Sequence, residues 1–268
     1  MNTQRTPTYT SLIMLLGLLL VAGCSPTQVV EDAEQMTAEP VPTHTAEPTS
    51  TITPTIQAEQ PQETCDLELP GPDNWQVQLC DSFNDNNNEW QLESQDNPYA
   101  RYVTDIGDGK LQIDYSAKAF ESFTRSAITW FDIGQGGDFA LTISGLIDSQ
   151  LLNTGWGIAF RADDEMRSYY LFSIKNDDTF SLEYNNDNKN WIPFIPSTGH
   201  SSIRNADVNT VKITADGDIF TFWINGEQVA TFEGVQLEGD LIRLMVSAAE
   251  GAGAVFSFDD VVLQTPTS

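Results

Sequence analysis

The feature that most constrains the fold is a series of short segments in which apolar residues recur at every second position. The dipeptides Asp108-Gly109, Asp216-Gly217 and Asn225-Gly226 lie between several of them. A period of two is typical of strands that bury one face, and such dipeptides favour tight hairpins. The segments are Lys110–Tyr115, Phe139–Ile147, Trp156–Arg161, Tyr169–Lys175, Thr179–Tyr184, Val211–Thr214, Ile219–Asn225, Gln228–Glu233, Leu241–Ser247 and Ala254–Leu263. About ten to fourteen strands in about 200 residues predict an all-β fold, an antiparallel jelly-roll sandwich of two sheets.

The first 23 residues have the layout of a secretory signal. Arg5 is their one charged residue, and an apolar run of 12 residues, SLIMLLGLLLVA, follows it. At about 1.5 Å per residue the run covers about 18 Å, less than a hydrocarbon core of about 30 Å, so a membrane-spanning helix is the weaker alternative. The ending Leu20-Val21-Ala22-Gly23-Cys24 resembles the lipobox of bacterial lipoproteins.

This resemblance implies that residues 1–23 are removed and that Cys24 carries acyl chains. Several chains together are enough for stable anchoring to a membrane. The protein is then expected in the cell envelope, on the outer face of the cell membrane. Because Ser25 replaces the aspartate of the family's retention signal, a two-membrane cell would place the protein in its outer membrane.

Residues 24–64 are predicted to form a disordered stalk between the anchor and a domain over 65–268. From Ser25 to Thr64 the chain has six Pro, nine Thr and seven acidic residues, with no Lys or Arg. Such a segment cannot bury a core, and it acts as a spacer. Its Thr and Ser residues serve either solvation or O-glycosylation.

Cys65 and Cys80 are the two cysteines left once Cys24 is acylated. An even number in an exported protein favours a disulfide, which would close a loop of about 15 residues at the start of the domain. Two free thiols are the alternative. A metal site is less favoured because no third cysteine or histidine lies nearby.

The charge balance excludes one large class of ligand. The chain has 39 acidic against 12 basic residues, a formal charge of −27. Nucleic-acid binding depends on basic side chains that displace counterions, so no nucleic acid is expected as a partner. Residues 65–268 stay strongly acidic, and this favours a neutral or cationic ligand unless basic residues make a local exception.

Strand alternation predicts a candidate ligand platform on the outer face of one sheet. Sugars stack their C–H faces on aromatic rings and offer hydroxyls to polar side chains. If the strands are neighbours, Gly157 and Ala159 leave a shallow trough between the candidates. The candidate ligand-binding residues are Arg161, Tyr169, Lys175, Glu183, Trp191 and Trp223. Structural alternatives remain: Trp191 packs under its own loop, Trp223 shields an edge, and Arg161 pairs with Asp163 or Glu183.

Three segments together resemble the concanavalin A-like, laminin-G-like jelly rolls of bacterial surface lipoproteins. They are GWGIAFRADDEMRSYYLFSIKNDDTFSLEY, NTVKITADGDIFTFWINGEQVATF and VFSFDDVVL. The resemblance covers about Asp81 to Leu263, and the 3-keto-disaccharide hydrolase-like domain is a relative within this group. It implies the fold far more than an activity, because one fold hosts many functions.

Jelly rolls of this resemblance frequently hold a structural Ca²⁺ where the first and last strands meet. The matching oxygen ligands here are Asp81 and Asp85 at the start, and Asp259 and Asp260 at the end. Carboxylates are suitable ligands for this hard cation. The alternative is a solvated acidic turn.

These observations predict a lipid-anchored surface protein that binds a glycan or another extracellular polymer through one sheet face. The alternatives are a glycoside-acting hydrolase of the 3-keto-disaccharide hydrolase-like group and a laminin-G-like protein-interaction module. A retaining glycosidase needs two close carboxylates, and no strand carries the alternating acids of laminarinase-type enzymes. No catalytic residue is therefore assigned, and the oligomeric state is left open.

Overall fold

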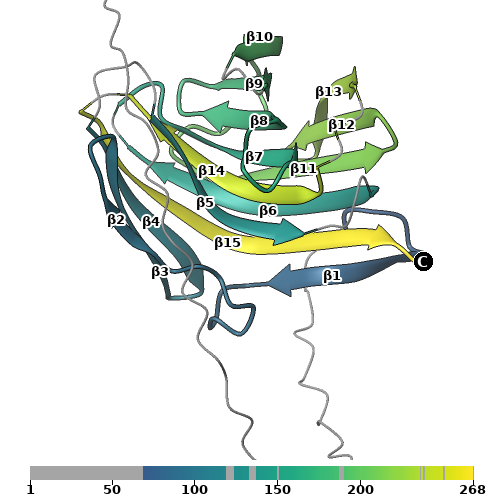
Figure 1. The fold of residues 1–268 in the computed structure, drawn as a ribbon, viewed down its shortest axis with the longest axis horizontal. Helices are drawn as coiled ribbons and strands as arrows, with labels where there is room; N and C mark the ends of the chain where they lie inside the picture. Colours follow the sequence, from purple (N-terminus) through teal and green to yellow (C-terminus); the bar gives the residue numbers. More distant parts are fainter. Residues whose placement is uncertain are drawn as a thin grey trace, which may run out of the picture. The chain divides into compact units, whose positions relative to one another are not determined.

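A computed structural model describes residues 69–118, 124–132, 137–149, 151–186, 190–235, 237, 239–249 and 251–267, with 124–132 described by backbone alone. Within these ranges all regular structure is β-strand, and no helix there is long and apolar enough to cross a membrane. Two antiparallel sheets pack face to face (Figure 1). The predicted two-sheet jelly roll is confirmed, whereas the predicted signal peptide and stalk lie outside the described residues.

The larger sheet has nine strands in the order β13-β12-β11-β6-β15-β4-β3-β2, with β1 also paired to β15. Its strands are β1 (Trp75–Asp81), β2 (Ser94–Asp96), β3 (Ala100–Gly107), β4 (Lys110–Ala117), β6 (Phe139–Asp148), β11 (Asn209–Asp216), β12 (Ile219–Ile224), β13 (Glu227–Glu233) and β15 (Gly253–Pro266). The long strands β6 and β15 run side by side at its centre (Figure 1).

The smaller sheet has six strands in the order β10-β9-β8-β7-β14-β5. They are β5 (Thr124–Asp132), β7 (Gly155–Ala162), β8 (Tyr169–Lys175), β9 (Thr179–Asn185), β10 (Trp191–Gly199) and β14 (Leu241–Ala248). All ten segments predicted from alternation are strands, with ends that differ by a few residues. The strands β1, β2, β3, β5 and β10 were not predicted.

Aromatic side chains from both sheets interlock in one core. Phe172 of β8 stacks on Phe222 of β12 with 4.5 Å between ring centres. Trp156 of β7 meets Phe258 of β15 edge to face at 5.3 Å. These rings are buried, as the alternation of their strands predicts. The core therefore fixes which side chains of β6, β11 and β12 point outward.

The edge strands β10 and β13 close one side of the sandwich. Phe194 of β10 lies 4.6 Å from Phe232 of β13, centre to centre. Pro193 and Pro196 interrupt β10, which pairs with β9 through two register shifts. These prolines explain why alternation did not reveal the strand.

Candidate ligand-binding site

Three outward-facing side chains form a row across neighbouring strands of the nine-stranded sheet. Thr142 of β6 is in register with Lys212 of β11, and Lys212 is in register with Trp223 of β12. Their sequence neighbours Val211 and Phe222 are buried in the core. Because side chains alternate along a strand, the row lies on the outer face of the sheet.

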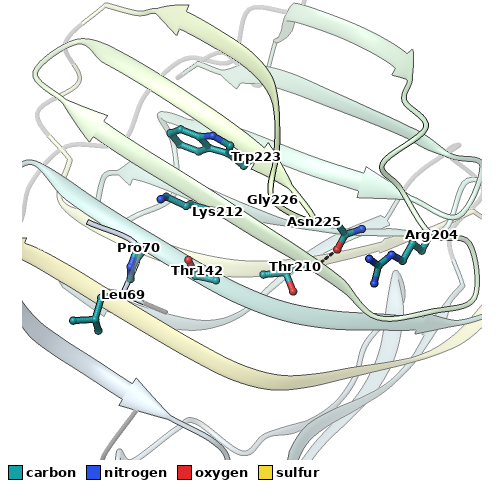
Figure 2. Close-up of a pocket in the computed structure, with 9 residues that line it drawn as sticks. All are labelled: Leu69, Pro70, Thr142, Arg204, Thr210, Lys212, Trp223, Asn225 and Gly226. Atoms are coloured by element: carbon teal, nitrogen blue, oxygen red, sulfur yellow. Dashed lines mark hydrogen bonds between the residues drawn. The ribbon is translucent and has the colours of Figure 1, made fainter. Parts of the chain in front are cut away.

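The row forms part of a pocket of about 480 Å³. Such a volume falls within the range of small-molecule sites. Figure 2 shows its residues, and it places Lys212 beside Trp223 and Arg204 on the far side of Thr210. The lining residues are Leu69, Pro70, Thr142, Arg204, Thr210, Lys212, Trp223, Asn225 and Gly226.

Lys212 and Trp223 contact each other inside the pocket. The Lys212 ammonium lies 4.9 Å from the centre of the Trp223 ring, which is a cation–π distance. Both side chains are half-buried. The pair thus presents an aromatic surface and a positive charge at the same place.

The part of the pocket next to Thr210 is built by a hydrogen-bonded turn. Asn225 has a φ of 52° and precedes Gly226 in the turn between β12 and β13. Its side-chain oxygen accepts from the Thr210 backbone N–H at 2.9 Å, and its amide nitrogen donates to the Ser202 carbonyl at 2.7 Å. The Asn225 side chain therefore fixes the turn against β11, where Thr210 lines the pocket.

The first described residues of the domain form one wall of the pocket. Leu69 and Pro70 line it, and the backbone N–H of Gly71 donates to Oε1 of Gln264 on β15 at 2.7 Å. A Cβ at Gly71 would lie 3.0 Å from Trp75 and 3.1 Å from Ala140. The segment therefore lies directly against the outer face of the sheet.

The predicted platform is only partly assembled. Strands β7 and β8 are neighbours, as expected, with Ala159 in register with Leu171. Trp223, however, lies in the other sheet, so its predicted placement beside Tyr169 and Lys175 is wrong. Alternation gives the face of a strand but not the sheet to which it belongs.

Arg161 points inward, against the prediction of an outer-face position. Its φ is 53°, and the pairing of β7 with β14 shifts register at this point. This bulge reverses the face: the guanidinium lies 5.8 Å from the Phe220 ring centre and donates to the Gly217 carbonyl at 3.2 Å. The side chain is buried, and burial lowers the pKa of Arg161 while Asp138 and Asp218 oppose this effect.

The predicted trough at Gly157 is absent for a packing reason. A Cβ at Gly157 would lie 2.4 Å from the Phe172 carbonyl oxygen. The space between Gly157, Leu171, Ser173 and Met245 amounts to about 10 Å³. That is barely room for one water molecule, so the glycine serves the close approach of β8 to β7.

The other platform residues do share the outer face of the six-stranded sheet. Tyr169 of β8 meets Trp191 of β10 edge to face at 5.8 Å. Lys175 ends β8, Glu183 of β9 is in register with Leu171, and both side chains are half-buried. A ligand role for these four residues stays a prediction.

The four predicted calcium ligands are used differently. Asp81 is buried, and its two carboxylate oxygens accept from the Phe83 N–H at 2.7 Å, from Asn88 at 2.7 Å, and from the Trp90 indole. Asp85 accepts from Asn87 on the surface. Asp259 and Asp260 lie in β15 where its register with β6 shifts.

Three N–H donors already occupy the Asp81 carboxylate. Throughout the described ranges, no group of three or more His, Cys, Asp and Glu side chains is arranged to hold a metal. Calcium binding by Asp81, Asp85, Asp259 and Asp260 stays a prediction.

Two further predictions concern cysteines and catalysis. Cys80 lies in β1, whereas Cys24 and Cys65 lie outside the described residues, so acylation and the disulfide stay predictions. Glu183 is the one acid among the described side chains of the six-stranded sheet. A retaining glycosidase needs a pair of close carboxylates, and the described side chains of this sheet supply one.

Sequence reasoning found Trp223 but missed the residues around it. Thr142 and Lys212 carry polar side chains on predicted strands, Thr210 directly precedes the predicted strand Val211–Thr214, and Arg204 lies in a loop. One available signal was Gly217, because a two-residue hairpin loop formed by Gly217-Asp218 sets Lys212 opposite Trp223. Leu69 and Arg204 reach the pocket through long-range packing, for which the sequence carries no such signal.

No family model matches the chain, and no curated protein matches it. Among solved structures, an endo-β-galactosidase from Clostridium perfringens that releases GlcNAcα1-4Gal is similar with a TM-score of 0.52 and 12% identity over 75% of this chain. This chain spans 65% of that enzyme chain, just under two thirds.

The κ-carrageenase from Pseudoalteromonas carrageenovora, solved with a κ-carrageenan oligotetrasaccharide, has a TM-score of 0.50 and 12% identity over 78% of this chain and 99% of its own. The carbohydrate-binding module CBM66 from Bacillus subtilis has a TM-score of 0.37 and 16% identity over 68% of this chain and 91% of its own. At these identities the two similarities at or above 0.50 establish the jelly-roll fold. Solved proteins of that fold thus include glycoside hydrolases.

Proposed function

We propose that the protein is a lipid-anchored cell-surface protein that binds a glycan, or another extracellular polymer, on the outer face of β6, β11 and β12. The observation that carries this proposal is the half-buried Trp223 at the edge of a pocket of about 480 Å³. An aromatic ring offers a stacking surface for the C–H face of a sugar.

The polar residues of the pocket support the same ligand class. Thr142 and Thr210 both line the pocket; Thr142 is in register with Lys212, and the Thr210 hydroxyl shares a hydrogen bond of 2.9 Å with the Ser144 hydroxyl. Sugar hydroxyls both donate and accept hydrogen bonds, and a threonine hydroxyl can act as the partner in either case. Trp223 and these hydroxyls come from adjacent strands, so the surface is rigid before the ligand arrives.

The test is affinity electrophoresis of the full-length protein through gels that contain a panel of polysaccharides. Trp223→Ala should weaken retention by about tenfold or more, as expected for the loss of an aromatic anchor. Trp191→Ala is the matched control, because Trp191 lies in the other sheet, 37% exposed, outside the pocket. Retention that depends on Trp191 and not on Trp223 would move the site to the six-stranded sheet.

The anchor and location belong to the same proposal. Acylation of Cys24 would hold the domain outside the cell membrane, or at the outer membrane of a two-membrane cell, with residues 25–64 as a spacer. Cys24→Ser should release the protein from the membrane fraction into the medium. Continued membrane association of this variant would contradict the anchor.

A further inference from the structure

The charged residues of the pocket are opposite in sign to the net charge of the domain. Residues 65–268 contain 32 acidic and 11 basic residues. The pocket is lined by two charged side chains, Lys212 and Arg204, and both are cationic. No acid is among its lining residues, so the pocket is locally positive on an acidic protein.

Neither cation is committed to an ion pair within the described residues. The ion pairs there join Lys118 to Asp96, and Arg167 to Asp163 and Glu165. The Lys212 ammonium rests over the Trp223 ring, which holds its position without neutralising its charge.

Arg204 is exposed, but its backbone is fixed. Its N–H donates to Oδ1 of Asn209 at 2.8 Å, and its carbonyl accepts from Nδ2 of Asn209 at 2.8 Å. Asn209 is buried at the start of β11. The guanidinium therefore extends from a rigid loop, on the opposite side of Thr210 from Lys212 (Figure 2).

We infer that the ligand is an acidic glycan, whose sugars carry sulfate or carboxylate groups that Lys212 and Arg204 bind. This inference rests on the glycan-binding function proposed above and specifies its ligand class. Arginine binds the oxygens of such groups in a bidentate manner, and lysine acts as a compact point charge. Thr142, Thr210 and Trp223 then contact the neutral part of the sugar.

The negative charge of the whole domain does not prevent this binding. At physiological ionic strength exposed charges are screened beyond about 8 Å. A ligand group seated in the pocket therefore responds mainly to the two cations beside it. Distant acids slow the approach of an acidic polymer more than they weaken the bound state.

The experiment compares chemically matched polysaccharides against the full-length protein. A sulfated galactan is used before and after desulfation, and polygalacturonate before and after methyl esterification, in affinity gels at 150 mM salt. We expect retention by one or both acidic members, and a loss of about tenfold after the charge is removed. The two pairs separate sulfate from carboxylate recognition.

Variants then assign the effect to the pocket. Lys212→Gln and Arg204→Gln should each weaken binding to the acidic member by about fivefold or more. Lys110→Gln is the control, because Lys110 begins β4 and does not line the pocket. It removes the same charge and should leave binding unchanged.

The outcomes separate this inference from the broader function. Equal retention of the acidic and neutral members that is lost in Trp223→Ala would overturn the acidic ligand and leave glycan binding intact. Equal weakening by Lys110→Gln and Lys212→Gln would also overturn it, since net charge would then explain the effect. Failure to bind any member of either pair or any neutral glycan would overturn both proposals.

Discussion

The Tyr170 hydroxyl makes two hydrogen bonds to one residue: it donates to the Val235 carbonyl at 2.7 Å and accepts from the Val235 N–H at 2.9 Å. Tyr170 is fully buried in β8 and Val235 follows β13. The hydroxyl thus links the segment that follows β13 of the nine-stranded sheet to β8 of the six-stranded sheet.

This arrangement predicts a loss of stability in alkali. Burial raises the pKa of Tyr170 above its ordinary value of 10.0. Below about pH 10 the phenol is neutral in both states; above it the unfolded chain releases the proton first, so the free energy of unfolding falls as pH rises. Tyr170→Phe should lower stability by about 1–3 kcal/mol at pH 8 and flatten the alkaline decline. Urea unfolding at pH 8 and about pH 10.5 measures both effects, and an unchanged decline in the variant would contradict this role.

Asp81 is predicted to stabilise the loop before Trp90. Asp81→Asn replaces an acceptor of three N–H bonds with a group that has donors of its own, so we expect a loss of about 2–3 kcal/mol in the free energy of unfolding. Asp85→Asn is the control, because Asp85 is exposed. Equal small effects of both variants in urea unfolding would show that the buried carboxylate is not structural.

Gly157 is predicted to be irreplaceable on steric grounds. Gly157→Ala places a methyl group 2.4 Å from the Phe172 carbonyl oxygen, which is backbone and cannot move alone. We expect a loss of about 3 kcal/mol or more, or failure to fold. A Cβ at Gly107 meets nothing within 4 Å, so Gly107→Ala should change the thermal midpoint very little. A well-folded, stable Gly157→Ala protein would contradict the close strand packing.

The expected disulfide between Cys65 and Cys80 can be tested by alkylation. Without reductant, neither thiol should react, and mass spectrometry of peptides should find the two joined. Reduction should lower the free energy of unfolding by about 3 kcal/mol for a loop of about 15 residues. Full alkylation of both cysteines before reduction would refute the disulfide.

The strands could be predicted from the sequence because the burial of one strand face requires an apolar residue at every second position. Tyr169–Lys175 coincides with β8, since Tyr170, Phe172 and Ile174 place an apolar residue at every second position. Strand β10 escaped because its prolines break that pattern and both of its faces are largely exposed. Local alternation therefore reveals strands with an apolar face toward the core and misses a strand such as β10, whose two faces are both largely exposed.

The candidate site was less predictable because it depends on strand order and backbone detail. Trp223 was assigned to the sheet of Tyr169, yet the chain crosses between sheets before β11. Arg161 was assigned to the outside, and a single residue with positive φ turned it inward. Neither the crossover between sheets nor the bulge at Arg161 changes the hydrophobic periodicity of the sequence.

The prolines of β10 affect whether neighbouring copies of this protein can pair through their sheet edges. An edge strand with exposed Trp191 and Ile192 would invite a second chain to extend the sheet and start aggregation. Pro193 and Pro196 have no backbone N–H, so the hydrogen bonds that they would donate to an added strand are missing. The free margin of the six-stranded sheet at β10 is thus protected against self-association, even at high local density.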